Sequence, residues 1–179
     1  DSPNTDGDKN KPPNLVLYDY QASRSGQCAR DYLNGYSGYL QVDGYAGYEK
    51  NDATLVGCWA HARRKFIEAQ QTQVKGKTGK ADGAINHIKK LYRIESEIKQ
   101  KTALKKKTAR QDQSVALLNQ FKTWLDKSAL QVPPKSAVGK AIAYSLRQWP
   151  KLIRYTEDGY LNIDNNRAER AVKPFVIGR

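Results

Sequence analysis

The sequence predicts an α/β fold in which a short, strand-rich start is followed by a long helical middle. Strand-like, helix-like and strand-like segments alternate over residues 14–59, an order typical of parallel strands joined by crossovers. From residue 61 to 145, apolar residues instead recur every three or four positions, as on one face of a helix. We therefore expect a small parallel sheet that carries a large helical segment.

Three segments of the start have the composition of strands. Residues 14–20 are apolar and aromatic and lie between a Pro-Pro pair and a Ser- and Gly-containing stretch, which predicts a buried strand. Residues 38–43 form the second candidate strand and residues 53–59 the third. With a helix between the first two, these segments predict a parallel βαβ unit.

Residues 23–33 have the pattern of a helix that packs on this sheet. Ser23 or Ser25 can serve as its N-cap, because a serine hydroxyl accepts a hydrogen bond from an N–H of the first turn. The expected inner face consists of Cys28, Ala29, Tyr32 and Leu33.

The middle of the chain predicts several amphipathic helices. Residues 75–83 are expected to form a flexible loop, and a third helix is expected to run from Ser136 and stop before Pro150. One predicted apolar face comprises Ile85, Ile88, Leu91, Tyr92 and Ile98, and another comprises Leu118, Phe121, Trp124 and Leu125.

The last part of the chain predicts a hairpin and a short helix. Residues 155–163 place Asp-Gly between aromatic and aliphatic residues, which is a hairpin signal. A final helix is expected after Asp164 and before Pro174.

The net charge of +13 is concentrated in one segment. Residues 61–110 carry 15 of the 31 Lys and Arg residues but only 4 of the 18 acids. Such a cationic segment favours nucleic acid as a partner through its phosphates, although a lysine-rich, solvated helix pair would have the same composition. Charge by itself leaves both interpretations open.

Membrane and secreted proteins are poor matches to this composition. No apolar run approaches the roughly 20 residues needed to cross a bilayer, and the first residues are polar. Two cysteines, Cys28 and Cys58, are too few for a disulfide-stabilised secreted domain, so we expect a cytoplasmic protein. The polar opening and the lack of methionine predict a chain shortened at its N-terminus.

Two acidic residues could carry chemistry, and each also has a purely structural explanation. Asp43 follows a predicted strand, where α/β folds collect ligands, but Asp-Gly is also a common turn dipeptide. Glu169 could offer a hard oxygen ligand to Mg²⁺, or could pair with Asn166 in a capping box. The residues alone do not decide between these alternatives.

Cys58 and His61 have the spacing of half a zinc site. Because Cys28 and His87 are the only other soft ligands and form no second spaced pair, tetrahedral zinc is not expected. We expect instead a packed cysteine and a histidine that faces phosphate or substrate. Three cations follow, which could contact DNA phosphates or be solvated: Arg63, Arg64 and Lys65.

Four segments together resemble a known family. They are YDYQASRSGQCAR at residues 18–30, VDGYAGY at 42–48, GCWAHARRKF at 57–66, and DNNRAERAVKP at 164–174 with the final Gly-Arg. In order and spacing they resemble the DDE transposases of insertion-sequence family sixty-six, of TnpC type, across essentially the whole chain.

The resemblance implies an RNase H-like core, incomplete at its N-terminus, with a basic all-helical insertion. Residues 1–60 would supply core strands and a helix, residues 61–158 the insertion, and residues 159–179 the final core helix. Asp43 would be the second catalytic acid and Glu169 the third, which bind two Mg²⁺ or Mn²⁺ ions in the full-length enzyme.

The resemblance also implies partners and supporting residues. The protein would bind transposon ends and target DNA as a homo-oligomer in the bacterial nucleoid, without a membrane. Asp164, Asn165 and Asn166 would support the site. The residues expected to contact DNA are His61, Arg63, Arg64, Lys65, Lys105, Lys106, Lys107, Arg167 and Arg170.

The first catalytic acid of the family, in an Asp-Glu-Thr motif, has no counterpart in this sequence. Asp1, Asp6 and Asp8 lie in a loop-like segment, and Asp19 comes too late, within a predicted strand. We therefore expect the chain alone to be inactive. Two other functions stay open: a non-catalytic DNA-binding module, and an RNase H-like nuclease of repair or junction resolution.

Overall fold

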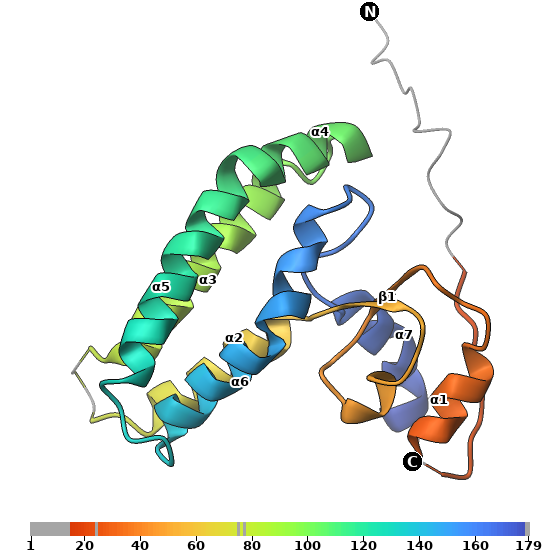
Figure 1. The fold of residues 1–179 in the computed structure, drawn as a ribbon, viewed down its shortest axis with the longest axis horizontal. Coiled ribbons are helices and arrows are strands. Elements are labelled where there is room, and N and C mark those ends of the chain that lie inside the picture. Colours follow the sequence, from red (N-terminus) through yellow and green to blue (C-terminus); the bar gives the residue numbers. More distant parts are fainter. Residues whose placement is uncertain (1–14, 24, 75, 77, 178–179) are drawn as a thin grey trace, which may run out of the picture.

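The fold is mixed and rich in helices, which agrees with the α/β class at that level. The computed structural model describes residues 15–23, 25–74, 76 and 78–177. In that part of the chain, two short strands lie beside a larger group of helices (Figure 1). Asp1, Asp6 and Asp8 lie outside the described residues, as does the final Gly-Arg pair.

The sheet consists of two parallel strands. β1 (Tyr39–Gln41) and β2 (Thr54–Val56) pair in register, with Tyr39 opposite Thr54 and Gln41 opposite Val56. Parallel strands need a long connection, and this one is a loop that contains a single 3₁₀ turn, η1 (Ala46–Tyr48). The second and third predicted strands are therefore confirmed, over shorter ranges than expected.

The first predicted strand is wrong. Residues 15–20 form no strand, and Leu15 and Leu17 are 75% and 76% exposed. A strand requires a neighbour for its backbone groups, and no strand of the described chain lies beside this segment. The predicted βαβ unit is consequently not formed, and the segment contacts the last helix instead, where the Tyr18 hydroxyl donates to the Ala171 carbonyl at 2.9 Å.

The predicted helix after this segment is confirmed, but its expected inner face is not buried. α1 (Gly26–Tyr32) is capped by the Ser25 hydroxyl, which accepts from the Gln27 N–H at 3.2 Å. No residue of α1 is buried, because the helix packs on the small η1 turn and not on a sheet. The approach is close: a Cβ atom on Gly26 would lie 2.8 Å from the Gly47 Cα.

The helical middle forms two layers that enclose most of the core. One layer contains α2 and α6 and the other contains α3 and α5 (Figure 1). Both predicted apolar faces point into this core; Tyr92 and Trp124 are only partly buried. The helices are α2 (Trp59–Gln71), α3 (Lys80–Glu97), α4 (Ala103–Ala109), the π turn η2 (Arg110–Ser114), α5 (Val115–Ala129) and α6 (Ala137–Leu152).

Aromatic packing fixes the start of α2 inside this core. The ring of Trp59 lies 5.8 Å from that of Trp149 and 5.9 Å from that of Phe121, measured between centroids. The Trp59 indole N–H donates to the Leu152 carbonyl at 2.9 Å, and its backbone N–H donates to the Ile163 carbonyl at 3.1 Å. The first turn of α2 is thus a rigid platform for the residues beside it.

Two predicted helix limits are wrong for the same reason. α6 continues through Pro150 to Leu152, because Trp149 and Leu152 are buried in the core and their burial outweighs the hydrogen bond that proline lacks. α3 begins at Lys80, so the predicted loop over 75–83 is too long. In both cases, packing of the helix in the core outweighs the local tendency of a proline or a glycine to end a helix.

The predicted hairpin at 155–163 is also wrong. η3 (Ile153–Thr156) extends α6, and a loop follows in which no described residue forms a strand. The guanidinium of the buried Arg110 donates to the carbonyls of Tyr155, Asp158 and Leu161, which replaces the cross-strand bonds of a hairpin. α7 (Asn166–Ile177) then confirms the final helix, although it includes Pro174.

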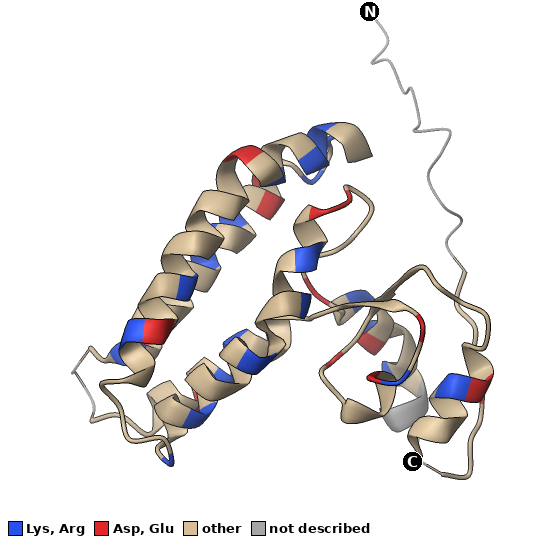
Figure 2. Cartoon of the chain, viewed as in Figure 1, with Lys and Arg blue, Asp and Glu red and all other residues tan. Residues whose placement is uncertain are grey.

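The charged side chains are distributed over the helices. Figure 2 shows Lys and Arg on both helical layers, on α4 and on α7. Within the described residues, no helix has the length and apolar composition that crossing a membrane requires.

Candidate functional site

The ends of the two strands place Asp43 and Cys58 at the same edge of the sheet. Gln41 pairs with Val56, and the Val42 N–H still donates to the Val56 carbonyl at 2.8 Å. Each of the two residues lies two positions beyond this last pair. Because the two strands are parallel, Asp43 and Cys58 both lie just beyond the carboxyl edge of the sheet.

The local geometry of Asp43 is that of a turn. Its side chain is exposed, and its Oδ1 atom accepts the N–H of Tyr45 at 2.9 Å. Gly44 has φ of +90°, a conformation that favours glycine. The Tyr144 hydroxyl donates to the Asp43 carbonyl at 3.3 Å, which ties the turn to α6. A role for the Asp43 carboxylate in metal binding stays a prediction.

Cys58 is buried between the end of β2 and the start of α2. It occupies the N-cap position of α2, and its Sγ atom accepts the Asn165 N–H at 3.2 Å. Burial raises the pKa of the Cys58 thiol, and hydrogen bonds from backbone N–H groups oppose that rise in part. The packed cysteine predicted from the sequence is thus observed.

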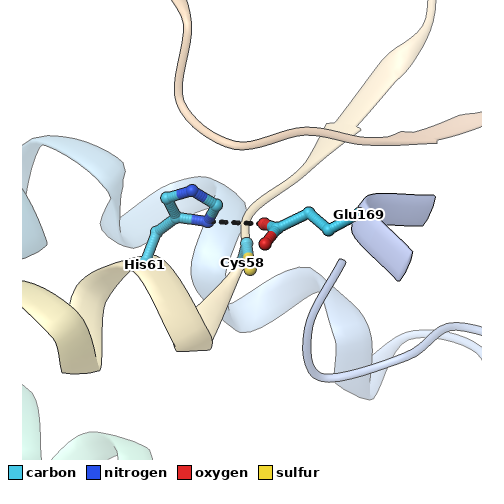
Figure 3. A group of neighbouring side chains, drawn as sticks. All are labelled: Cys58, His61 and Glu169. Carbon is cyan, nitrogen blue, oxygen red and sulfur yellow. Dashed lines mark ion pairs between the residues drawn. The ribbon is translucent and has the colours of Figure 1, made fainter. Parts of the chain in front are cut away.

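Glu169 lies in the first turn of α7 and faces the first turns of α2 (Figure 3). Its Oε1 atom is 3.6 Å from His61 Nδ1, and its Oε2 atom is 3.8 Å from the Arg64 guanidinium. His61 Nδ1 and Glu169 Oε1 are both buried atoms that make no hydrogen bond with any described residue. The carboxylate therefore lies among side chains of α2, and its buried Oε1 atom makes no hydrogen bond with a described residue.

Asp164 fixes the direction in which α7 leaves the core. One carboxylate oxygen accepts the Asn166 N–H at 3.1 Å, and the other accepts the Tyr92 hydroxyl of α3 at 2.9 Å. Burial, followed by the charge of Asp164, raises the pKa of the Tyr92 hydroxyl well above its ordinary value. Tyr92 is thus a neutral donor that anchors the start of α7.

Three ligand-type side chains converge at this point: Cys58, His61 and Glu169. One ligand atom from each lies within 4.8 Å of the others (Figure 3). Asp43 is not in this group. From the sequence, only Cys and His are expected as partners of Cys58 and His61. The third member, Glu169, comes from α7, more than a hundred positions away, and no local spacing points to it.

An open hollow of about 670 Å³ lies along α7 beside this cluster. Its lining is mixed: the Glu169 carboxylate, the side chains of Arg170 and Lys173, and apolar surface from Ala168 and Val172, together with Asn165 and Asn166. Of the three residues of the cluster, Glu169 is the one among the residues that line this hollow.

The residues expected to contact DNA do not gather at one place. Arg63, Arg64 and Lys65 lie on α2, and Arg167 and Arg170 are exposed on α7. Lys105, Lys106 and Lys107 lie on α4, which Figure 1 shows at the end of the α3 and α5 layer, away from α7. His61 turns its Nδ1 atom toward Glu169.

Comparison with known proteins identifies related sequences. The family model described as Transposase IS66 family matches residues 4–179. Uncharacterized protein y4qI of Sinorhizobium fredii (strain NBRC 101917 / NGR234) is 35% identical, over 93% of this chain and 32% of that protein. Uncharacterized protein y4jD of the same organism is 32% identical, over 96% of this chain and 35% of that protein.

The chain spans about a third of the length of these relatives. No solved structure matches the chain.

Proposed function

The chain belongs to the IS66 family of transposases, and from this we propose that it supplies two metal-binding carboxylates to a centre for DNA strand cleavage and strand transfer. The carboxylates are those of Asp43 and Glu169. Within a protein of the relatives' length, a third acid from another part of the chain would complete the centre.

One observation carries the proposal: α7 brings Glu169 next to the strand end that neighbours Asp43. Glu169 groups with Cys58, which follows the carboxyl end of β2, and Asp43 follows the carboxyl end of the paired strand β1. The strand end that carries Asp43 and the helix turn that carries Glu169 are far apart in the sequence. Local turn or capping interactions therefore do not explain why α7 packs near the ends of the strands. It supports a shared metal-binding edge.

The residues present fit a hard divalent ion, Mg²⁺ or Mn²⁺. Carboxylate oxygens are the preferred protein ligands of such ions, and Glu169 Oε1 is a buried acceptor that no described residue satisfies. When bound, a pair of such ions activates water or a DNA 3′-hydroxyl for in-line attack at phosphorus. The Arg64 guanidinium lies 3.8 Å from the other oxygen of Glu169, in a partly exposed ion pair.

We propose an RNase H-like core for the residues around this edge. β1, β2 and α7 would belong to that core, and α2 to α6, over residues 61–158, would form its helical insertion. Most of the hydrophobic core lies between α2, α3, α5 and α6, and it also includes Val56 of β2 and Ile163 of the loop before α7, so the helical segment packs directly on the proposed core elements. Its excess of positive charge suits a surface that holds the DNA backbone.

The proposal is tested with Asp43→Asn and Glu169→Gln in a protein of the relatives' length. Each should lower Mg²⁺-dependent strand transfer by more than the roughly 10- to 100-fold that loss of a supporting residue costs at metal sites. Binding of the same DNA, measured by fluorescence anisotropy, should change little, because neither carboxylate is a phosphate contact.

Matched controls are available nearby. Asp52→Asn and Glu68→Gln remove exposed acids of the same types from the loop before β2 and from α2, and both should keep full strand-transfer activity. If Asp43→Asn and Glu169→Gln were as active as these controls, the two acids would have structural roles only. The chain would then be a non-catalytic DNA-binding module.

A further inference from the structure

We propose that Cys58, His61 and Glu169 form a second kind of metal site, one that binds a thiolate-seeking divalent ion of the Zn²⁺ class. The ligands would be Cys58 Sγ, His61 Nδ1 and Glu169 Oε1. This site shares Glu169 with the hard-ion site proposed above but takes its other two ligands from sulfur and imidazole, so it depends neither on Asp43 nor on the proposed function.

The distances suit a single small ion. In a tetrahedral zinc site, with bonds of about 2.0–2.3 Å, neighbouring ligand atoms are about 3.5 Å apart. His61 Nδ1 and Glu169 Oε1 are already 3.6 Å apart, and one ligand atom from each of the three residues lies within 4.8 Å of the others. A rotation of side chains, without movement of the helices, would complete the geometry.

The surroundings support ligand roles for all three atoms. His61 Nδ1 and Glu169 Oε1 are buried yet without a hydrogen bond among the described residues, which is costly unless another group, such as an ion, satisfies them. The Asn165 N–H points at Cys58 Sγ, and a backbone donor of this kind stabilises a metal-bound thiolate. Sulfur and imidazole ligands favour Zn²⁺ over Mg²⁺.

The ion would link two helices that are otherwise joined at this point by weak contacts. Cys58 and His61 belong to the first turn of α2, which the core holds rigidly, and Glu169 belongs to α7. The ion pairs from His61 and Arg64 to Glu169 are 3.6 and 3.8 Å long and partly exposed, so they contribute little. A bound ion would therefore fix α7, and with it Glu169, against the core.

The experiment is cobalt and zinc titration of the purified 179-residue chain in the presence of a phosphine reductant. Co²⁺ should bind at one ion per chain and produce a thiolate-to-cobalt charge-transfer band in the near ultraviolet. Zn²⁺, measured by competition with a chromophoric chelator, should displace it. Zn²⁺ should also slow hydrogen–deuterium exchange in α7.

The chain holds a matched control for each soft ligand. Cys58→Ser should abolish the charge-transfer band, and His61→Gln should weaken Zn²⁺ binding at least about a hundredfold; His61→Gln serves alone if the buried Cys58→Ser does not fold. Cys28→Ser and His87→Gln should bind Zn²⁺ like the unchanged chain. Stoichiometric binding that survives His61→Gln, or no binding by the unchanged chain, would overturn the proposal.

Asp43→Asn separates this proposal from the proposed function. It should remove Mg²⁺-dependent strand transfer but leave Zn²⁺ affinity unchanged, because Asp43 is outside the three-residue group. A loss of Zn²⁺ affinity in Asp43→Asn would show that Asp43 helps to bind both ions. That result would contradict a Zn²⁺ site formed by Cys58, His61 and Glu169 alone.

Discussion

Arg110 shows how one side chain can replace a piece of secondary structure. It is 2% exposed, and two of its nitrogens donate to the Glu95 carboxylate at 2.9 and 2.7 Å. Its remaining bonds go to the carbonyl of Tyr155 in η3 and to those of Asp158 and Leu161 in the loop between η3 and α7. A buried charge requires this degree of pairing, and here the pairing organises a loop that has no strands.

Replacement of Arg110 by Met should destabilise the protein by about 3–5 kcal/mol, because it leaves the Glu95 carboxylate and the loop carbonyls buried without donors. Urea unfolding followed by circular dichroism measures the change. Arg93→Met is the control: its ion pair with Glu97 is exposed, and its loss should cost at most about 1 kcal/mol. A similar small loss for Arg110→Met would contradict the role assigned to the pair.

At the scale of elements, the start of α3 depends on one carboxylate. Asp82 accepts the Gly79 N–H at 2.7 Å and the side-chain amides of Gln73 and Gln70 at 2.8 and 2.5 Å. The Gly79 N–H, followed by the two amides, lowers the pKa of Asp82 from 3.8 to about 2. The charged carboxylate therefore ties the end of α2 and the loop after it to the first turn of α3.

This lowered pKa predicts a defined dependence of stability on pH. A group whose pKa falls on folding contributes stability above its unfolded pKa, and that contribution is lost as the pH falls toward the folded value. Asp82→Asn should therefore be less stable than the unchanged chain at pH 6, and the difference should shrink between about pH 4 and pH 2. Urea unfolding at a series of pH values tests this, and a difference independent of pH would contradict it.

Element limits were predictable where the signal was a periodic apolar face, and not where it was a single residue. The faces of α3 and α5 were correct because burial of many side chains contributes more than any local preference. The limit expected at Pro150 was wrong because burial around it dominates. The strand expected at residues 15–20 was wrong because apolar composition does not supply a pairing partner.

At the scale of the whole molecule, the positive charge is spread over several elements: Lys and Arg occur on both helical layers, on α4 and on α7 (Figure 2). The lysines of α4 lie at one end of the α3 and α5 layer, and the cations of α2 and α7 lie near the candidate site. A long duplex could contact both regions, but the structure does not gather them into one patch. The contribution of each region to DNA binding is thus separable.

The α4 lysines should make a large electrostatic contribution to DNA binding. If each contacts one phosphate, changing Lys105, Lys106 and Lys107 to Ala should reduce the slope of log K against log salt by about 2.7, at about 0.9 per contact. Fluorescence anisotropy with duplex DNA over a range of NaCl concentrations measures the slope.

A control triple variant removes the same charge elsewhere. It changes two lysines of α5 and one of the loop that follows, and it should alter the slope much less: Lys122, Lys127 and Lys135. Equal changes for the two triple variants would mean that net charge, and not the position of α4, determines binding.

The sequence by itself was sufficient for the mixed α/β class and for the helical middle with its two apolar faces. Through the family resemblance it also predicts Asp43 and Glu169 as metal-binding acids, and that role stays a prediction. These conclusions depend on periodicity, composition and motif spacing, which are local properties of a chain. Only the tertiary structure could bring Glu169 to Cys58 and His61, join Arg110 to the carbonyls of Tyr155, Asp158 and Leu161, and leave residues 15–20 outside the sheet. Such contacts join positions far apart in sequence, and they form only when packing of the whole core fixes the relative directions of the helices.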